Sequence, residues 1–189
     1  KAAAAAVRSR MINFGQSCIA AKRFIIEASV YDAFVALFLQ ELSKLKSGSP
    51  LDEDASYACM ARPTLAAELY QQVCKTVALG ARILAGGKAP ETGSARFEPT
   101  VLENIPKESP AYSEELFGPV ASLFKVASTE EAVALANATE FGLGASLWTA
   151  DPVRGTALAA NLESGAVFLN ALVASHPMLP FGGIKKSGY

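Results

Sequence analysis

Cys18 is the first residue whose type could carry chemistry. It follows Gly15-Gln16-Ser17, at a break between a predicted helix and a predicted strand where a side chain can face a cleft. A cysteine in this place either packs as a small apolar side chain or attacks as a thiolate, and attack needs a neighbour that favours the thiolate. His176, the single histidine, is the obvious helper in a Cys–His hydrolase. Position alone leaves these alternatives open.

A second pattern is a pair of carboxylates in the stretch EELFGPV at residues 114–120. Glu114 and Glu115 precede Phe117 and a Gly-Pro turn, which leads into a predicted strand. The stretch is either a solvated acidic loop or a site where one carboxylate accepts the hydroxyl groups of a ribose, with the aromatic ring packed nearby. The residues by themselves are compatible with both interpretations.

A third pattern is the glycine- and lysine-rich stretch PFGGIKKSG at residues 180–188. Such composition suggests phosphate binding, but neither GxGxxG nor GxxxxGK[ST] occurs in the sequence. The stretch therefore predicts a tight turn that carries the chain beneath a pocket, and the chain has no nucleotide fingerprint of its own. The motifs GxSxG and HExxH are also absent.

Composition excludes several classes of protein. The 189 residues are 51% hydrophobic, enough for one domain with a real core. The net charge of −1 and the lack of a polybasic run argue against nucleic acid or an anionic membrane as partner. No apolar run is long enough for a membrane span, and nothing points away from the cytoplasm. Three cysteines without paired spacing indicate a reducing compartment, and with one histidine we expect no metal site.

Apolar periodicity and turn residues predict an alternation of helices and strands. We expect helices at 2–13, 31–45, 64–79, 129–138 and 152–162, strands at 19–26, 82–84, 120–126, 144–149 and 165–170, and an exposed excursion at 88–98. Ser128 and Glu131 form a capping box, and Asp151 precedes a proline at the first helical position. The alternation predicts an α/β fold of three layers, a mostly parallel sheet with helices on both faces.

Taken in order, these pieces resemble the aldehyde dehydrogenase family. NFGQSC at 13–18, with the following Arg23, resembles the cysteine signature of the family, and EELFGPV resembles its ribose-contacting motif. The stretch 165–170 followed by 180–188 resembles its closing motif, with the ten-residue step from Asn170 to Pro180. The resemblance covers essentially all 189 residues.

The resemblance implies roles for particular residues and a cofactor, NAD or NADP. Cys18 would attack an aldehyde to give a thiohemiacetal and then a thioester, with its main-chain N–H as half of the oxyanion hole. Glu115 would hold the nicotinamide ribose, with Phe117 beside it. Phe181 would line the substrate tunnel and Asn170 would support the floor of the site. His176 then falls in a substrate loop and is not needed as a base.

The resemblance also implies that parts of the enzyme lie elsewhere. The general-base glutamate, the oxyanion asparagine and the nucleotide-binding fold of the family would precede Lys1, and the tail used for oligomer contacts would follow Tyr189. We therefore expect residues 1–189 to be a catalytic-domain fragment, inactive alone, of a homo-oligomeric enzyme. Two other classes stay open: a hydrolase, which needs Cys18 in hydrogen-bond reach of His176, and a non-catalytic α/β interaction module, which needs Cys18 buried.

Within the family, the run KRFIIE at 22–27 and Lys185-Lys186 most resemble the succinate-semialdehyde dehydrogenase branch. Ser175, five residues after Asn170, matches a serine that binds the substrate carboxylate in that branch. The arginine that some members carry six residues before the cysteine is Ile12 here. The resemblance thus implies succinate semialdehyde as substrate, with another cation for the carboxylate, and the alternative is a dehydrogenase for another aldehyde. It does not decide between NAD and NADP.

Overall fold

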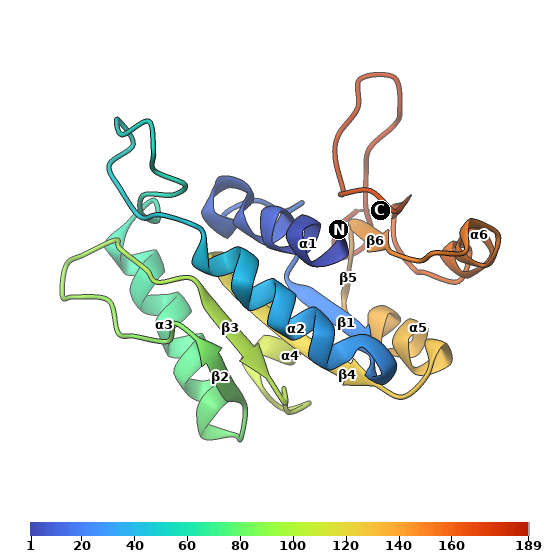
Figure 1. Ribbon diagram of the computed structural model, residues 1–189, viewed down its shortest axis with the longest axis horizontal. Coiled ribbons are helices and arrows are strands. Elements are labelled where there is room, and N and C mark those ends of the chain that lie inside the picture. Colours follow the sequence, from blue (N-terminus) through green and yellow to red (C-terminus); the bar gives the residue numbers. More distant parts are fainter. Residues whose placement is uncertain (189) are drawn as a thin grey trace.

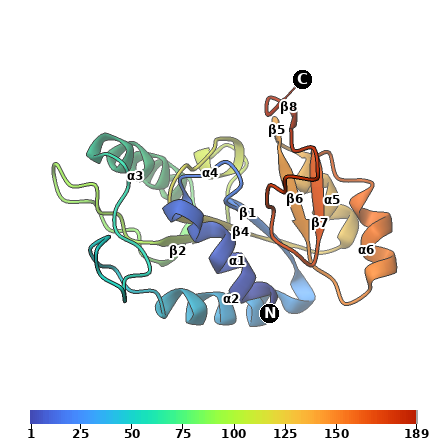
Figure 2. The ribbon, with the colours of Figure 1, turned by 90° about the horizontal axis from the view of Figure 1, so that it is seen from above.

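The computed structural model describes residues 1–188 and arranges them as helices around short β-sheets (Figure 1). In chain order the elements are α1 (Ala2–Met11), η1 (Ile12–Gly15), β1 (Arg23–Glu27), α2 (Ala28–Ser43), α3 (Pro63–Ala78), β2 (Arg82–Ala85), β3 (Thr100–Glu103), α4 (Pro110–Ser113), β4 (Val120–Val126), α5 (Thr129–Asn137), β5 (Phe141–Gly142), β6 (Gly144–Leu147), α6 (Pro152–Ala159), β7 (Ala166–Leu169) and β8 (Ile184–Lys185). Figure 2 shows two groups, α1–α4 with β1–β4, and α5 and α6 with β5–β8.

The larger sheet has the strand order β1-β4-β3-β2. Strands β1 and β3 both pair with β4 in parallel, and β2 pairs with β3 in the antiparallel direction. Strand β4 is apolar on both faces: Val120 packs in a cluster with α3 and α4, whereas Ala121 and Leu123 pack in a cluster with α1 and α2. Figure 2 shows α2 on one side of this sheet and α3 and α4 on the other. The predicted α/β fold, a mostly parallel sheet between helices, is confirmed.

Element boundaries differ from the predictions where long-range contacts or turns intervene. The strand predicted at 120–126 is present with those bounds, but the strand predicted from residue 19 begins only at Arg23. Its first residues instead form a turn, in which the Ala20 amide donates to the Ser17 carbonyl at 3.1 Å. The four residues of β3 lie where no strand was predicted. All four are nevertheless buried, since β3 lies between β2 and β4.

The second group of elements is a small β–α–β unit. Strands β6 and β7 pair in parallel, with α6 as the connection between them. The predicted helix starts are confirmed: the Ser128 hydroxyl accepts from the Glu131 amide at 3.2 Å, and the Asp151 carboxylate accepts from the Arg154 amide at 3.0 Å. Within residues 1–188, no helix is both long and apolar enough to cross a membrane.

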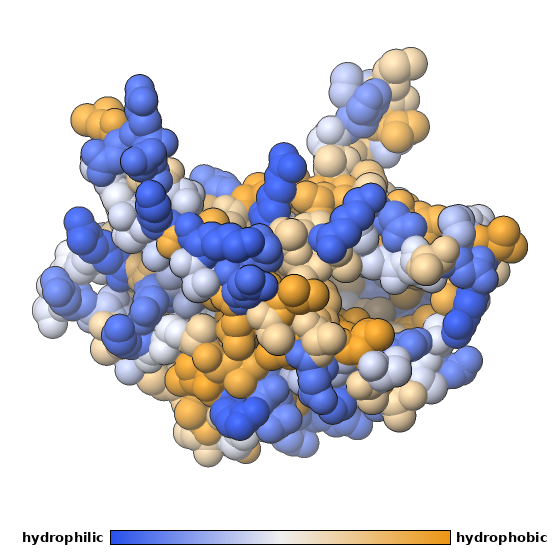
Figure 3. Space-filling view, viewed as in Figure 1, coloured by the Kyte–Doolittle hydropathy of each residue, from blue (hydrophilic) through white to orange (hydrophobic). Residues whose placement is uncertain are grey.

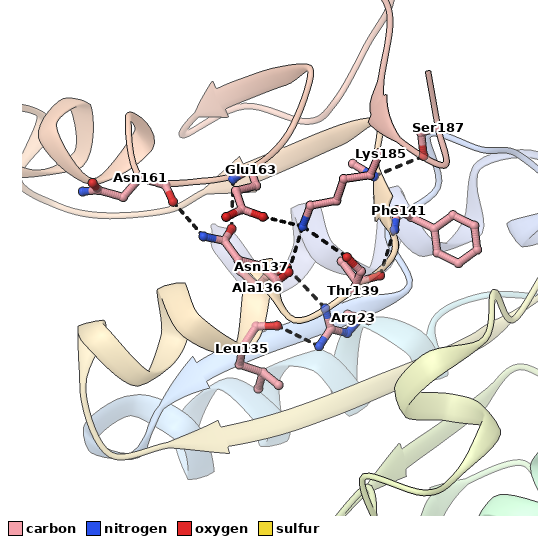
Figure 4. A network of polar contacts seen from close by, with 11 residues as sticks. Arg23, Leu135, Ala136, Asn137, Thr139, Phe141, Asn161, Glu163, Lys185 and Ser187 are labelled. Carbon is pink, nitrogen blue, oxygen red and sulfur yellow. Dashed lines mark hydrogen bonds and ion pairs between the residues drawn. The ribbon is translucent and has the colours of Figure 1, made fainter. Parts of the chain in front are cut away.

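Two basic side chains meet at the carboxyl end of α5 (Figure 4). Arg23, in β1, donates to the carbonyl oxygen of Leu135 at 2.9 Å. Lys185, in β8, donates to the carbonyl oxygens of Asn137 and Thr139 at 2.8 and 3.1 Å, and pairs with Glu163 at 2.6 Å. Cations are favoured at this end of a helix, where carbonyl groups lack intrahelical partners. The contacts join β1, which follows Cys18, to the turn at 180–188.

The outer face of α2 is partly apolar. Figure 3 shows apolar surface gathered over the middle of this face of the molecule, where α2 lies in Figure 1. Two residues of α2, Val30 and Leu37, are 55% and 49% exposed. They are two helical turns apart and therefore lie on the same side of the helix.

Candidate active site

The backbone before Cys18 has an unusual conformation. Helix α1 ends at Met11, and Asn13, Phe14 and Gly15 then have left-handed φ angles of 47°, 54° and 75°. This region costs an L-residue roughly 1–2 kcal/mol, so neighbouring contacts must hold it. The Asn13 side chain donates to the Gln16 carbonyl at 2.9 Å, and the Phe14 ring stacks on Tyr57 with centroids 4.8 Å apart. The chain then turns through residues 17–20.

This bend presses the Cys18 loop against the EELFGPV stretch. A Cβ atom on Gly15 would overlap the main-chain carbonyl of Gly118, so no residue with a side chain fits there. The buried Arg10 side chain donates to the carbonyl oxygen of Gly15 at 2.8 Å and to that of Val120 at 3.3 Å. Burial lowers the pKa of Arg10 to about 10 and the Glu115 charge opposes this shift, so Arg10 is a cation at neutral pH. Arg10 thus binds the two segments together from inside.

Lys22 contacts the same two segments. Its ammonium donates to the carbonyl oxygens of Ser17, Cys18 and Ala20 at 3.0, 3.1 and 3.0 Å. The same nitrogen lies 2.9 Å from Oε1 of Glu115 and 5.7 Å from the centre of the Phe117 ring. Burial lowers the pKa of Lys22, and the hydrogen bond and charge of Glu115 oppose that shift. The predicted nucleophile and the predicted cofactor residues are therefore neighbours.

The two carboxylates of the EELFGPV stretch have different partners. Glu114 accepts from the Gln72 side chain of α3 at 2.8 Å, whereas Glu115 faces Lys22. The Glu115 side chain is 37% exposed. Phe117 is 42% exposed. With six residues of α3, the two side chains line a shallow depression of about 340 Å³ (Leu65, Glu68, Leu69, Gln71, Gln72 and Lys75). A partly exposed carboxylate and an exposed ring in one depression fit a ribose and the ring attached to it.

Cys18 is exposed, and so are Cys59 and Cys74; all three are free thiols. Exposure of Cys18 contradicts the interaction-module hypothesis, which needs the thiol buried, but exposure does not distinguish Cys18 from the other two cysteines. What distinguishes it is the loop around it. Among residues 1–188 its main-chain N–H has no acceptor, although its carbonyl is bound by Lys22. An unused N–H beside an exposed thiol is the arrangement that an oxyanion hole requires.

The residues predicted to contact substrate lie on the second group of elements. Asn170 follows β7 with a φ of 54°, and both ends of its amide bind the backbone of Thr149, each at 2.9 Å. Ser175 is exposed and Phe181 half-buried in the segment after β7, which projects from the body (upper right in Figure 1). No hydrogen bond joins this segment to the Cys18 loop in the part of the chain that the structure describes.

His176 lies in the same projecting segment. Its Nδ1 atom accepts from the main-chain amide of Met178 at 3.2 Å. No hydrogen bond between Cys18 and His176 exists among the described residues. The Cys–His hydrolase hypothesis therefore lacks the contact that it needs. Residues 1–188 also contain no cluster of three or more His, Cys, Asp and Glu side chains that could hold a metal ion.

Sequence reasoning missed the two cations that organise the site. Arg10 and Lys22 lie eight residues before and four residues after Cys18. Basic residues are usually solvated, so their types gave no sign of burial. The one available signal was their place on both sides of a candidate nucleophile.

The comparisons with known proteins identify the class. The model of the aldehyde dehydrogenase family matches residues 1–189, and the chain therefore belongs to this family. It is 46% identical, over all 189 residues, to succinate-semialdehyde dehydrogenase [NADP(+)] 1 of Mycobacterium ulcerans. It is 44% identical over 189 residues to an aldehyde dehydrogenase of Paenarthrobacter nicotinovorans. In both cases the chain spans 41% of the relative.

A solved structure agrees with these relatives. The succinic semialdehyde dehydrogenase of Streptococcus pyogenes, in complex with NADP⁺, matches the whole chain with a TM-score of 0.94 and 35% identity. The chain covers 41% of that structure. The predicted family, and the predicted likeness to its succinate-semialdehyde dehydrogenase members, are confirmed.

Proposed function

We propose that residues 1–189 are the cysteine-bearing catalytic domain of an NAD(P)-dependent aldehyde dehydrogenase that oxidises succinate semialdehyde. The observation that carries the proposal is the contact of Lys22 with both the Cys18 carbonyl and Glu115. It joins the loop that carries an exposed thiol to a carboxylate and a nearby aromatic ring, a pair suited to a nicotinamide ribose. Family membership and the names of the relatives support the reaction and the substrate.

Glu115 and Phe117 are the residues of this chain that would hold the cofactor. The carboxylate accepts the ribose hydroxyl groups, and the exposed ring packs beside the nicotinamide. When bound, the nicotinamide accepts a hydride from the substrate. The relatives' names and the NADP⁺ complex of the similar structure favour NADP over NAD.

Cys18 performs the covalent chemistry in this proposal. Its thiolate sulfur attacks the aldehyde carbon, and the carbonyl oxygen becomes the oxyanion of a thiohemiacetal. The Cys18 main-chain N–H, which has no other acceptor among residues 1–188, donates to that oxyanion. Loss of hydride converts the adduct to a thioester, and water then releases the carboxylic acid and regenerates the thiol. The base that activates water, and the second oxyanion donor, lie outside this chain.

The substrate residues in this proposal come from the segment after β7. The Ser175 hydroxyl donates to the substrate carboxylate, and the Phe181 ring lines the tunnel. Asn170 supports the floor indirectly, because its amide ties the end of β7 to the loop after β6 through Thr149. A carboxylate also needs a cation, which we place outside residues 1–189.

The complete enzyme in this proposal is a cytoplasmic homo-oligomer of which these residues form one part. The chain spans about two fifths of its curated relatives, and the exposed apolar side chains of α2 support burial against further protein. Initial rates of the complete enzyme over a panel of aldehydes, each with NAD⁺ and NADP⁺, test the proposal. The highest kcat/KM is expected for succinate semialdehyde. Equal rates with uncharged aldehydes of similar length would reassign the substrate, and nicotinamide-independent ester hydrolysis alone would reject the reaction.

A further inference from the structure

The Lys22 ammonium has more acceptors than it has protons. Four oxygen atoms lie within 3.1 Å of it: the three carbonyl oxygens of the Cys18 loop and Oε1 of Glu115. An ammonium carries three N–H donors, so four oxygens cannot all be bonded well at once. The side chain is 18% exposed, which leaves little water to make up the difference. Glu115 and the Cys18 loop therefore compete for Lys22.

We propose that Lys22 is a positioning residue that couples Glu115 to Cys18, so that binding at the Glu115 carboxylate changes the reactivity of the Cys18 thiol. The inference rests on the proposed function, in which Glu115 accepts hydroxyl groups of the cofactor ribose. Such hydrogen bonds engage the carboxylate and weaken its hold on Lys22. The three donors of Lys22 then match the three carbonyl oxygens of the loop, and the loop that carries the thiol is held more tightly.

Charge supports the same coupling. The pKa of Lys22 is lowered mainly by burial, then raised by Glu115, lowered by Arg10 and raised by Cys18. Lys22 therefore interacts with the Glu115 carboxylate and with the Cys18 thiolate. Because such interactions are reciprocal, the ammonium acts on the charge of the attacking Cys18 sulfur, and the opposite charge of Glu115 weakens that effect.

The fold separates this role from simple support of the loop. Arg10 already binds the base of the loop, at Gly15, to Val120 in β4. Within the loop, Lys22 binds residues 17, 18 and 20, the part that carries the thiol. Loss of Lys22 thus leaves the base of the loop in place and removes its link to Glu115.

A double-mutant cycle on the complete enzyme tests the coupling. The variants are Lys22→Met, Glu115→Gln and their combination, with Lys88→Met as the control, since Lys88 is 82% exposed and pairs only at 3.5 Å with Glu98. The rate of alkylation of Cys18 by iodoacetamide, without cofactor, is measured by peptide mass spectrometry. Cys59 and Cys74, in the same samples, report any general change in reactivity.

We expect Glu115→Gln to raise the Cys18 alkylation rate about fivefold and Lys22→Met to lower it about fivefold. In the Lys22→Met background, Glu115→Gln should change the rate by less than about twofold. The effects of the two substitutions should therefore not be additive, as expected for residues in contact. Lys22→Met should lower kcat more than it changes the aldehyde KM, and Lys22→Arg should restore part of kcat because it keeps the charge. Lys88→Met should match the native enzyme in every measurement.

Equal effects of Glu115→Gln in the two backgrounds would overturn the coupling. If Lys22→Met does not fold, Glu115→Gln alone decides, because an unchanged Cys18 alkylation rate in that variant rejects the inference. The proposed function is tested separately by Cys18→Ala. An active Cys18→Ala enzyme would reject the function. An inactive Cys18→Ala enzyme, together with additive effects of Lys22→Met and Glu115→Gln on alkylation, would reject only the role of Lys22.

Discussion

Gly15 and Gly118 pack main chain against main chain, with no space for a side chain on Gly15. Gly15 precedes the predicted nucleophile, and Gly118 belongs to the stretch with the predicted cofactor residues. Their contact, with Arg10 below it, brings together two segments that are far apart in the sequence.

Gly15→Ala should destabilise the protein and reduce activity. The new Cβ would overlap the Gly118 carbonyl, and a φ of 75° is unfavourable for alanine. We expect a loss of about 2–3 kcal/mol in the free energy of unfolding and at least a tenfold loss of kcat. Urea unfolding and initial rates measure the two effects. Gly93→Ala is the matched control, because Gly93 has a φ of 76° but nothing within 4 Å of its Cβ position. Equal losses in Gly15→Ala and Gly93→Ala would show that the positive φ alone causes the loss, with no contribution from overlap with Gly118.

Cys18→Ala and Cys18→Ser should abolish NAD(P)⁺ reduction in the complete enzyme. No other thiol lies in the loop that Lys22 and Arg10 hold. Cys59→Ala and Cys74→Ala should retain near-native rates, although their thiols are just as free and exposed. Spectrophotometric rates at saturating aldehyde measure the effect, and a near-native rate in Cys18→Ala would disprove the mechanism.

Glu115→Gln should impair cofactor binding more than aldehyde binding. The substitution removes the charged acceptor, and hydrogen bonds to charged groups contribute about 1.5–3 kcal/mol. We expect cofactor KM or kcat to worsen by about one to two decades, with little change in aldehyde KM. Glu114→Gln is the neighbouring control, since Glu114 binds Gln72 of α3 instead. A Glu115→Gln enzyme with only a raised aldehyde KM would reassign this residue to substrate binding.

Asn170→Ala should destabilise the β6–β7 unit. It removes two hydrogen bonds to the Thr149 backbone and places alanine at a φ of 54°. The expected cost is about 1–3 kcal/mol in the free energy of unfolding. Asn170→Gly, which removes the same hydrogen bonds without the backbone strain, should cost less. Thermal unfolding followed by circular dichroism compares the two, and a stability equal to that of the native protein would argue against this structural role.

Residues 1–189 alone should show no aldehyde-dependent NAD(P)⁺ reduction. They supply a nucleophile, but the proposal places the base and most of the cofactor site elsewhere, and ligand placement accounts for many orders of magnitude in rate. The purified chain should self-associate, because apolar side chains such as Val30 and Leu37 are exposed. Rate measurements and size-exclusion chromatography test both points. Robust turnover by the isolated chain would contradict this division of roles.

Local features of this protein could be predicted from the sequence alone. The strand at 120–126 and the caps at Ser128 and Asp151 are present as expected, because a long apolar run and a cap depend on residues close in the chain. The order of the three motifs also indicated the family without any coordinates. The short strand β3 was missed, because its burial depends on the neighbours that other parts of the chain provide.

The tertiary structure alone decided how the site is held together. Arg10 reaches the Val120 carbonyl across a sequence separation of 110 residues. Lys22 meets Glu115 only because β1 and β4 are adjacent parallel strands, which places the segments before them side by side. Burial of these two cations depends on long-range packing, and residue type gives no sign of it. The sequence determined which groups could do chemistry, and the fold decided that a lysine lies between them.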